Sequence, residues 1–293
     1  MHFVNAKTIL TSHSMNIYRG CTHGCIYCDS RSKCYQFTHD FEDIEVKQNA
    51  PELLEAALRK KRKRCMIGTG SMCDPYIPLE KELQLTRRCL EIIDHYNFGA
   101  AIITKSDLIL RDLDILSHIN QKTKAVVQMT LTTADDALCK KIEPGVCPTS
   151  RRFEVLKACQ NAGIPTVVWF SPLLPFINDT KENVEGIVDF CVRAGVQAII
   201  CFGIGVTLRE GNREYFYDAL DRIFPAAPGQ LSLKQRYIKT FGYNYMINSA
   251  NNSVLMSHLA NLCKQNNLML GTDSVFKWMQ NFPDTDPHQP ELF

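Results

Sequence analysis

Three cysteines stand close together near the start of the chain, in the stretch CTHGCIYC (residues 21–28). Cys21, Cys25 and Cys28 follow the spacing C-x3-C-x2-C, and Tyr27 directly precedes the third of them. Structural zinc takes four ligands, commonly as two separated pairs, and the sequence holds no second C-x2-C pair. A [4Fe–4S] cluster normally takes four thiolates, so three would leave one iron open to a small molecule. Both metals remain open at this point, with His23 or Cys34 as a fourth zinc ligand.

Disulfides explain the cysteine loop less well than either metal does. The chain has 13 cysteines, an odd number, and several lie in apolar runs such as QAIICFGIG (residues 197–205). Buried free thiols act as small hydrophobic groups and need no partner in a reducing cytosol. The N-terminus lacks an apolar signal segment, and no apolar run approaches the roughly 18 residues of a membrane span. We therefore expect a cytoplasmic protein without a membrane partner.

Composition limits the classes of partner. Of 293 residues, 45% are hydrophobic, which allows a large core, and 33 basic against 31 acidic residues give a net charge of +2. A near-neutral chain does not bind nucleic acid by total charge, although a local basic groove is compatible with it. The run KKRKR (residues 60–64) ends an expected helix, where cations complement the helix dipole and stay solvated.

The elements that position the cysteine loop alternate along the chain. Short apolar runs rich in β-branched residues are each followed by a helix-like segment, which indicates a parallel sheet buried on both faces. The expected strands are 15–20, 65–70, 99–106, 125–133, 165–175 and 196–206, and the helices that follow them are 51–64, 79–96, 108–121, 151–163, 180–195 and 213–224. Six such units predict an α/β fold, a partial (βα)6 TIM-type barrel of parallel strands.

The pattern changes after PAAPGQ (residues 225–230). Helical stretches such as 252–267 follow, without a further clear strand–helix pair. We expect a core barrel over residues 1–225 and a mainly helical C-terminal extension over 226–293.

Polar residues collect where the expected strands end, which is where parallel α/β folds place their chemistry. The cysteine loop follows the first strand, and Asp74 lies in the Gly-rich turn after the second. Lys105 ends the third strand and Thr130 lies in the fourth. The sequence therefore predicts that these side chains share one end of the sheet.

The motif and its placement resemble the radical S-adenosylmethionine (SAM) superfamily, whose hallmark is C-x3-C-x-aromatic-C after the first strand. DPYIPLEKELQLTRRCLEII (residues 74–93), IITKSDLILRDLDIL (102–116) and PLLPFIND (172–179) resemble its spore photoproduct lyase-like branch. The resemblance runs from about residue 14 to 205 and implies an enzyme with a [4Fe–4S] cluster and SAM as cofactors. One electron then cleaves SAM to methionine and a 5′-deoxyadenosyl radical, which abstracts hydrogen from a substrate.

The resemblance also implies roles for individual residues. Cys21, Cys25 and Cys28 would be the cluster ligands, Tyr27 would pack near the adenine, and Lys105 would meet the SAM carboxylate. Asp74 and its turn would face the SAM ammonium, and Thr130 would hydrogen-bond the ribose or carboxylate. Cys73 is assigned both to the cofactor site and, with Tyr76, to catalysis. The helix that starts at residue 151 opens with Arg151 and Arg152, candidates to pair with an acidic group near the cofactor.

The expected substrate is less defined than the cofactors. Spore photoproduct lyase repairs a thymine dimer and returns hydrogen from a cysteine, but the best register places Ser71 there and Cys73 two residues later. Lyase or repair chemistry on nucleic acid is one option, and modification of a peptide, RNA or metabolite is another. The resemblance also implies a flavodoxin- or ferredoxin-type electron donor. Two other hypotheses are an iron–sulfur protein that only transfers electrons and a zinc-stabilised interaction module.

Overall fold

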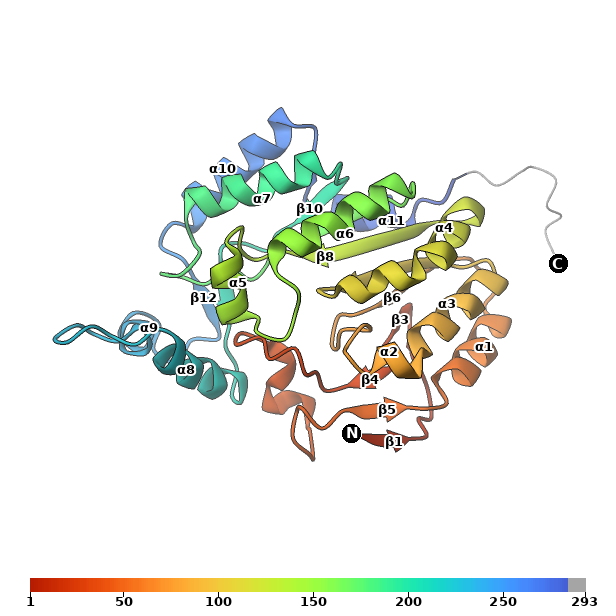
Figure 1. Ribbon diagram of the computed structural model, residues 1–293, viewed down its shortest axis with the longest axis horizontal. Coiled ribbons are helices and arrows are strands. Elements are labelled where there is room, and N and C mark those ends of the chain that lie inside the picture. The colour runs from red at the N-terminus through yellow and green to blue at the C-terminus, as the bar shows by residue number, and fades with distance from the viewer. Residues whose placement is uncertain (284–293) are drawn as a thin grey trace.

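A parallel sheet forms the centre of the molecule in the computed structural model, which describes residues 1–283 (Figure 1). Within those residues the largest sheet has the strand order β13-β10-β9-β8-β7-β6-β3-β2, with every neighbouring pair parallel except β2 and β3. Its strands are β2 (Leu10–Thr11), β3 (Ser14–Met15), β6 (Met66–Thr69), β7 (Gly99–Thr104), β8 (Ala125–Thr130), β9 (Thr166–Trp169), β10 (Ala198–Ile200) and β13 (Met269–Leu270). The predicted partial barrel of parallel strands is confirmed.

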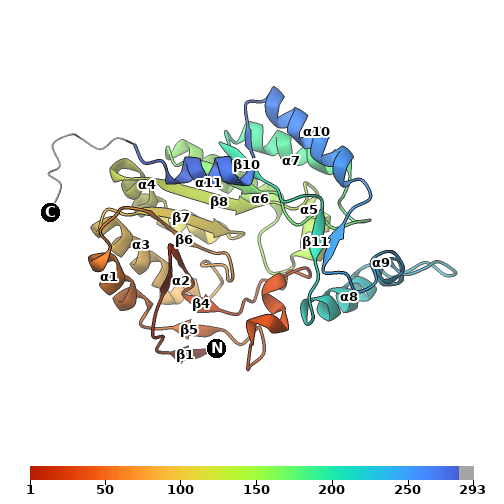
Figure 2. The ribbon, with the colours of Figure 1, turned by 180° about the vertical axis from the view of Figure 1, so that it is seen from behind.

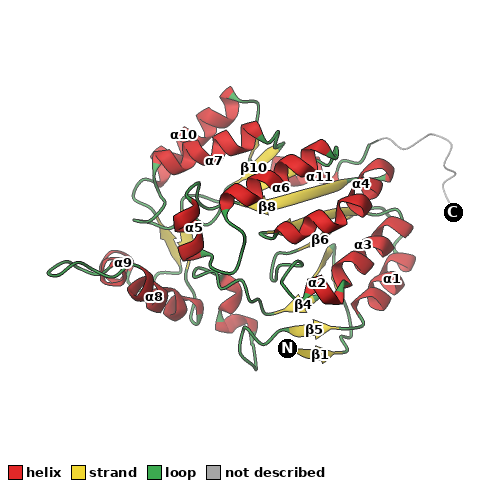
Figure 3. Cartoon of the chain, viewed as in Figure 1, coloured by secondary structure: helices red, strands yellow, loops and turns green. Residues whose placement is uncertain are grey.

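Amphipathic helices cover the outer face of this sheet (Figure 3). They are α1 (Ala50–Lys60), α3 (Leu85–His95), α4 (Leu113–Lys122), α6 (Thr149–Asn161) and α7 (Lys181–Arg193), with the short helices α2 (Glu80–Leu83) and α5 (Asp136–Ile142). α8 (Asn212–Ile223) lies apart from this sheet, beside α9 (Leu233–Phe241). In α3, for example, Leu85, Cys89, Leu90 and Ile93 are buried, the i, i+4 spacing of one helix face. The short helix α5 was not predicted, and it lies between β8 and α6.

The first predicted strand is split between two sheets. The chain leaves the large sheet after Met15, and β4 (Tyr18–Arg19) joins a three-stranded sheet with β5 (Glu45–Lys47) and β1 (His2–Val4). Gly20 then turns the chain into the cysteine loop with φ +89°, and a Cβ there would lie 2.4 Å from the carbonyl oxygen of Phe41. The loop continues into two short 3-10 helices, η1 (Asp29–Arg31) and η2 (Lys33–Tyr35). The cysteine loop is thus supported by a small sheet that the sequence pattern did not reveal.

The C-terminal part is mainly helical, as predicted, with α9 (Leu233–Phe241), α10 (Asn252–Gln265) and α11 (Thr272–Gln280). It also holds two strands that were missed. β13 pairs in parallel with β10, and β12 (Met246–Asn248) pairs antiparallel with β11 (Gly205–Thr207). Strands of two or three residues are too short to show a periodic pattern. The boundary at 225/226 stays a prediction.

The inner face of the sheet is partly closed by α11, as the view from behind shows (Figure 2). Val275 and Met279 of α11 pack in one buried cluster with Met66, Val126 and Ile200 of the strands. The polar loops at the carboxyl ends of the strands are not part of this cluster. α11 therefore leaves that end of the sheet accessible to a ligand. Within residues 1–283, none of the helices combines the length and the apolar character needed to cross a membrane.

Candidate active site

Two adjoining cavities lie at the carboxyl ends of the central strands. The cysteine cavity, about 90 Å³, is lined by Cys21, Cys25 and Cys28 together with Cys73 and Asp74. The strand-end cavity, about 430 Å³, extends over β8, β9 and β11. Both cavities are lined by Tyr27, Cys28, Ser30, Gly70, Ser71, Ile103, Lys105 and Thr130. The structure therefore brings together all of the predicted site residues except Tyr76.

The three loop cysteines suit a cluster better than a single metal ion. Among the described residues, Cys21, Cys25 and Cys28 do not gather their sulfur atoms within 4.8 Å of one another. Sulfur atoms on one tetrahedral zinc stand about 3.8 Å apart, given a Zn–S bond of about 2.3 Å. Ligands of different irons in a [4Fe–4S] cluster need the wider separation. Three thiols on one loop that line a common cavity can each ligate one iron, so the residues present fit an iron–sulfur cluster.

The thiols differ in their electrostatic surroundings. A hydrogen bond from Cys73, together with His23, holds the pKa of Cys21 well below its usual range despite burial. Burial raises the pKa of Cys25 and of Cys28, and nearby Lys105 opposes this rise at both. A cation at the edge of the cysteine cavity therefore favours the thiolate form that metal binding requires.

The loop that follows α5 braces the cysteine loop through backbone contacts. The Ile26 N–H donates to the Ile142 carbonyl at 3.0 Å, and the Gly145 N–H donates to the His23 carbonyl at 2.9 Å. The approach at Gly145 leaves no room for a side chain, because a Cβ would lie 2.7 Å from the His23 carbonyl oxygen. On the other side, the Cys21 N–H donates to the Phe41 carbonyl at 3.1 Å. These contacts fix the loop before any cofactor binds.

A buried ion pair fixes Tyr27. Glu143 and Arg152 are both fully buried, and Arg152 Nη2 lies 2.5 Å from Glu143 Oε2. The Tyr27 hydroxyl donates to the same carboxylate, and Arg152 Nη1 donates to the Thr130 carbonyl at 2.9 Å. Burial raises the pKa of Glu143, but Arg152 and Lys105 outweigh it, so the pKa is lowered and the carboxylate stays charged. The network ties the cysteine loop to the end of β8.

Glu143 was not singled out from the sequence, although Arg152 was expected to meet an acidic partner near the cofactor. Arg151 has a separate, exposed partner in Asp107, at 2.8 Å. The available signal for Glu143 was its place directly before Pro144 and Gly145, at the end of the short helix α5. That pattern also fits a solvated turn. Only the burial of Glu143 with Arg152 in the structure shows that Glu143 is part of the site.

Asp74 joins the ends of β6 and β7. Its Oδ1 accepts hydrogen bonds from Thr104 Oγ1 at 2.7 Å and from the Tyr76 N–H at 2.9 Å, and its Oδ2 accepts one from the Lys105 N–H at 2.8 Å. His23 Nδ1 lies 3.5 Å from Oδ2. Both carboxylate oxygens are therefore engaged within the protein, and Asp74 positions Lys105 beside the cavities.

Lys105 is the cation of the site. Its side chain lines both cavities, and among residues 1–283 its ammonium forms no hydrogen bond or ion pair. The ammonium lies 5.9 Å from the centre of the Tyr27 ring. Burial lowers the pKa of Lys105, but Cys25 and Glu143 outweigh it and raise the pKa. The site thus presents a charged donor that an anionic ligand group can reach.

Cys73 and Ser71 occupy different positions in the turn after β6. Cys73 is buried, donates to the Gly20 carbonyl at 2.7 Å and lines the cysteine cavity but not the strand-end cavity. Ser71 is exposed and lines both. Cys73 therefore lies beside the sulfur of Cys21, and Ser71 faces the space that a substrate would enter.

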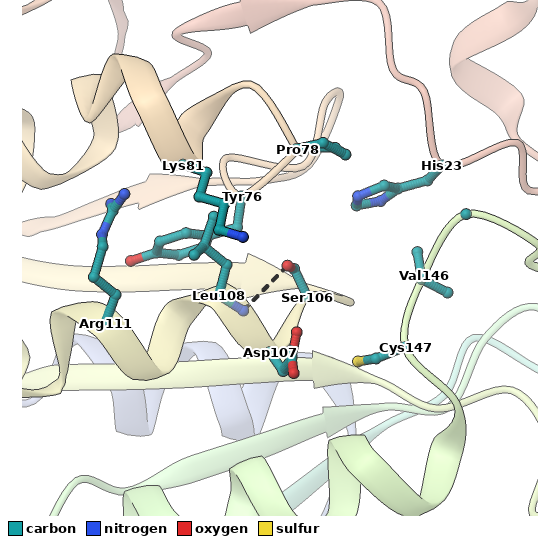
Figure 4. Close-up of a pocket in the computed structure, with 11 residues that line it drawn as sticks. His23, Tyr76, Pro78, Lys81, Ser106, Asp107, Leu108, Arg111, Val146 and Cys147 are labelled. Carbon is teal, nitrogen blue, oxygen red and sulfur yellow. Dashed lines mark hydrogen bonds between the residues drawn. The ribbon is translucent and has the colours of Figure 1, made fainter.

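Tyr76 lies apart from both cavities. It is almost completely buried, and its hydroxyl donates to Asp112 Oδ2 at 3.0 Å. Its ring lines a third, outer cavity of about 430 Å³ with His23, Lys81 and Arg111 (Figure 4). In that view the hydroxyl points away from His23. The contact with Asp112 places Tyr76 in the packing between the turn after β6 and η3 (Asp107–Asp112).

Aromatic and arginine side chains gather beside Asp29 and Met246, two residues that line the strand-end cavity, without lining it themselves. The Arg–Tyr rim comprises Tyr35, Arg209, Arg213, Tyr243 and Tyr245. The Arg209 guanidinium lies 4.8 Å from the ring centre of Tyr245 and 6.0 Å from that of Tyr35, and Arg213 lies 5.7 Å from that of Tyr243. Tyr243 is 82% exposed, and Met246, just after Tyr245, lines the cavity itself. Such a surface offers stacking faces and positive charge together.

Comparison with known proteins gives one family. The family model of the radical SAM superfamily matches residues 15–191. An uncharacterised protein of Mycobacterium tuberculosis is 27% identical over 232 residues, 75% of this chain and 66% of that protein. An uncharacterised protein of Methanocaldococcus jannaschii is 32% identical over 169 residues, 57% of this chain and 62% of that protein. The matches thus span slightly less than two thirds of these relatives' own length.

Solved structures share the fold at low identity. A cysteine-to-serine mutant of spore photoproduct lyase superposes with a TM-score of 0.65 at 13% identity, covering 92% of this chain and 80% of that chain. A radical S-adenosylmethionine methyltransferase from Kitasatospora setae superposes with a TM-score of 0.55 at 14% identity, covering 89% of this chain and 54% of that chain. These likenesses extend beyond the barrel into the C-terminal part.

Proposed function

The chain belongs to the radical SAM superfamily, and we propose that it is an enzyme that cleaves SAM reductively at the two adjoining cavities. Members of this family bind a [4Fe–4S] cluster and SAM, which together supply a 5′-deoxyadenosyl radical when bound. The observation that carries the proposal is the position of Lys105. Lys105, whose ammonium forms no hydrogen bond or ion pair among residues 1–283, lines both the cavity of the three cysteines and a cavity large enough for a small ligand.

The cysteine loop would hold the cluster. Cys21, Cys25 and Cys28 would each ligate one iron and leave one open, and their shared place in the lining of the cysteine cavity supports this. Cys73 would act through Cys21, since hydrogen bonds to ligand sulfur tune the potential of a cluster. Burial of Cys21 and Cys25 excludes water from this side of the site.

The residues around the strand-end cavity would bind SAM. Lys105 would attract its carboxylate, with Asp74 holding the Lys105 backbone in place. Tyr27, fixed by Glu143, would pack against the adenine, and Thr130 would offer its hydroxyl at the end of β8. A sulfonium held this way lies beside the cysteine cavity, as electron transfer requires.

The substrate we propose is nucleic acid. The Arg–Tyr rim contacts Asp29, which lines the strand-end cavity, and bases stack on aromatic rings and guanidinium planes. One of the structures that share the fold is spore photoproduct lyase with dinucleoside spore photoproduct, at a TM-score of 0.65 and 12% identity. Ser71 in place of the lyase's expected cysteine argues for a different fate of the substrate radical. The proposal is therefore a nucleic-acid substrate without the lyase's cysteine-based hydrogen return.

Stimulation of SAM cleavage by nucleic acid tests the substrate. The reconstituted enzyme would be incubated with dithionite, SAM and either a thymine-photoproduct dinucleotide, an undamaged oligonucleotide or heparin as a plain polyanion. We expect 5′-deoxyadenosine to form faster with a nucleic acid and not with heparin. Arg209→Ala and Tyr245→Ala should lose this gain, and Arg222→Ala, an exposed arginine on α8, should keep it. SAM cleavage that no nucleic acid accelerates would contradict the proposed substrate. It would not contradict the proposed cleavage of SAM.

The reductant and the location complete the proposal. Radical SAM enzymes need an electron donor, and a flavodoxin- or ferredoxin-type protein would approach through the outer cavity (Figure 4). His23, between two of the cysteines, reaches that cavity, and Lys81, which also lines it, would attract an acidic donor. All thirteen cysteines are free thiols, which suits the cytoplasm as a reducing compartment.

A further inference from the structure

A second group of metal-ligating side chains lies on the small N-terminal sheet, away from both cavities. One ligating atom from each of His2, His39 and Glu45 lies within 4.8 Å of the other two. His2 and Glu45 are direct partners in the parallel pairing of β1 with β5, and His39 reaches them from the loop after η2. Residues far apart in the sequence thus place two imidazoles and one carboxylate together.

Both histidines are held with one ring nitrogen free. His39 Nδ1 lies 2.9 Å from the Asp40 carbonyl oxygen, and His2 Nδ1 lies 3.0 Å from Asp43 Oδ2. Both partners are acceptors, so each Nδ1 carries the proton and each Nε2 keeps its lone pair. Metal-binding histidines are oriented in this way, by a carbonyl or carboxylate on the nitrogen that does not ligate. The hydrogen bonds at Nδ1 therefore orient both rings so that Nε2 can ligate a metal ion.

The free nitrogen of His39 has no partner. His39 Nε2 is buried without a hydrogen bond and lies 3.7 Å from Glu45 Oε2, too far for one. In the neutral imidazole, Nε2 and this carboxylate oxygen are both acceptors, and a metal cation placed between them would bind both. Arg19 Nη1 lies 3.7 Å from the same oxygen, but its Nη2 donates to the carbonyls of Tyr35 and Gln36. Arg19 is thus hydrogen-bonded to these carbonyls and forms no hydrogen bond with Glu45.

We infer that His2, His39 and Glu45 bind one divalent transition-metal ion of the zinc class. Imidazole and carboxylate are ligands that Zn²⁺ accepts, with water available for a fourth position. Tetrahedral nitrogen and oxygen ligands stand about 3.3 Å apart, so a small inward movement of the side chains closes the site. This ion is separate from the proposed cluster and from SAM cleavage.

The ion has a structural role beneath the cysteine loop. It links β1 and β5 to the segment between η2 and β5, and Phe41 in that segment accepts the Cys21 N–H. Gly20 packs against the same Phe41 carbonyl. Metal binding at the small sheet therefore stabilises the support of the first cluster ligand.

Zinc content measures the site directly. The full chain would first be reconstituted with iron and sulfide, so that the cluster occupies the loop cysteines, then equilibrated with Zn²⁺ and desalted. We expect about one zinc per chain in the wild type, and its loss in His39→Ala and Glu45→Gln with iron unchanged. The matched control is His118→Ala, which removes an exposed histidine that pairs with Asp94. Equal zinc in the wild type and both site variants, or none in the wild type, overturns the inference.

The thermal midpoint of the wild type is a second readout, which does not depend on whether a variant folds. The thermal midpoint of the wild type should rise as Zn²⁺ is added, because a ligand that binds only the native state stabilises it. Glu45→Gln, which keeps the shape of the side chain, should show a much smaller rise. A wild-type midpoint that does not respond to Zn²⁺ contradicts the site whatever His39→Ala does.

Discussion

At the scale of single residues, the most informative group is a half-buried cation, Lys105, whose ammonium has no hydrogen bond or ion pair within residues 1–283. Burying such a charge is costly unless a counter-charge meets it, yet Lys105 keeps its charge beside Cys25 and Glu143. An arriving carboxylate would satisfy the ammonium directly. The residue is therefore organised for a ligand rather than for the stability of the protein alone.

Replacement of Lys105 by methionine tests this role. Lys105→Met removes a charge-assisted hydrogen bond of about 1.5–3 kcal/mol, so SAM affinity should fall by about 10- to 150-fold. Equilibrium dialysis of SAM against the reconstituted protein measures the change. Iron content should stay as in the wild type, and Lys157→Met, on the exposed face of α6, should bind SAM normally. An unchanged affinity would assign Lys105 to packing.

The buried carboxylate Glu143 leads to a prediction with a defined pH dependence. Because its folded pKa is lowered, the stabilisation is complete above its ordinary pKa of 4.5 and is lost as the pH falls toward the lowered value. Glu143→Gln leaves Arg152 buried without its counter-charge and should cost about 3–5 kcal/mol at pH 7.

Urea unfolding of both proteins at several pH values measures this difference. The difference in the free energy of unfolding between the wild type and Glu143→Gln should be largest at pH 7. It should become smaller below pH 4.5, where Glu143 of the wild type begins to be protonated. Glu154→Gln, an exposed carboxylate on α6, should change little at any pH. A difference that is absent at pH 7, or that grows on acidification, contradicts the buried pair.

The site residues that could be predicted from the sequence are those whose local motif indicates their role. The spacing of the loop cysteines and the strand-end positions of Lys105 and Thr130 predict one site, and the structure brings them together. Glu143 and the pair of His39 with Glu45 were missed, because their contacts join segments that no local pattern links. Tyr76 shares a turn with Cys73 in sequence, but its side chain packs into another part of the molecule.

At the scale of elements, the long parallel strands were predictable and the short ones were not. β7 and β8 carry nearly continuous buried apolar runs, which give a clear pattern. β4, β12 and β13 hold two or three residues each, and tertiary contacts decide their pairing. The same holds for the loop 142–147, whose backbone supports the cysteine loop without any sequence motif.

Gly145 tests that support. Gly145→Ala places a methyl group against the His23 carbonyl, and overpacking of this kind costs about 1–3 kcal/mol. We expect the cysteine loop to shift and iron per chain after reconstitution to fall several-fold. Gly68→Ala in β6 is the matched control, because its Cβ would meet only ordinary contacts of 3.7 and 3.9 Å. Equal iron in both variants would show that the loop needs no such brace.

At the scale of the whole molecule, the C-terminal part completes the barrel. β13 covers the edge of β10, and α10 buries Leu255, Leu259 and Cys263 in the main core. α11 buries Val275 and Met279 against the inner face of the sheet. The segment after residue 225 thus contributes to the same core as the predicted barrel.

A truncated chain of residues 1–225 tests whether the barrel folds alone. Removal of β13 exposes a strand edge, and removal of α10 and α11 exposes apolar surface, so aggregation is the expected result. Size-exclusion chromatography and thermal melting measure it against the full chain. A monomeric fragment with a cooperative melt would instead support an independent domain boundary at 225.

The central claim is that three cysteines and one lysine at the strand ends generate a radical from SAM. The direct measurement is 5′-deoxyadenosine, detected chromatographically after anaerobic reconstitution and incubation with dithionite and SAM. We expect 5′-deoxyadenosine from the wild type and none from Cys25→Ala. A fully reconstituted cluster that yields no 5′-deoxyadenosine, or product that persists in Cys25→Ala, would contradict it.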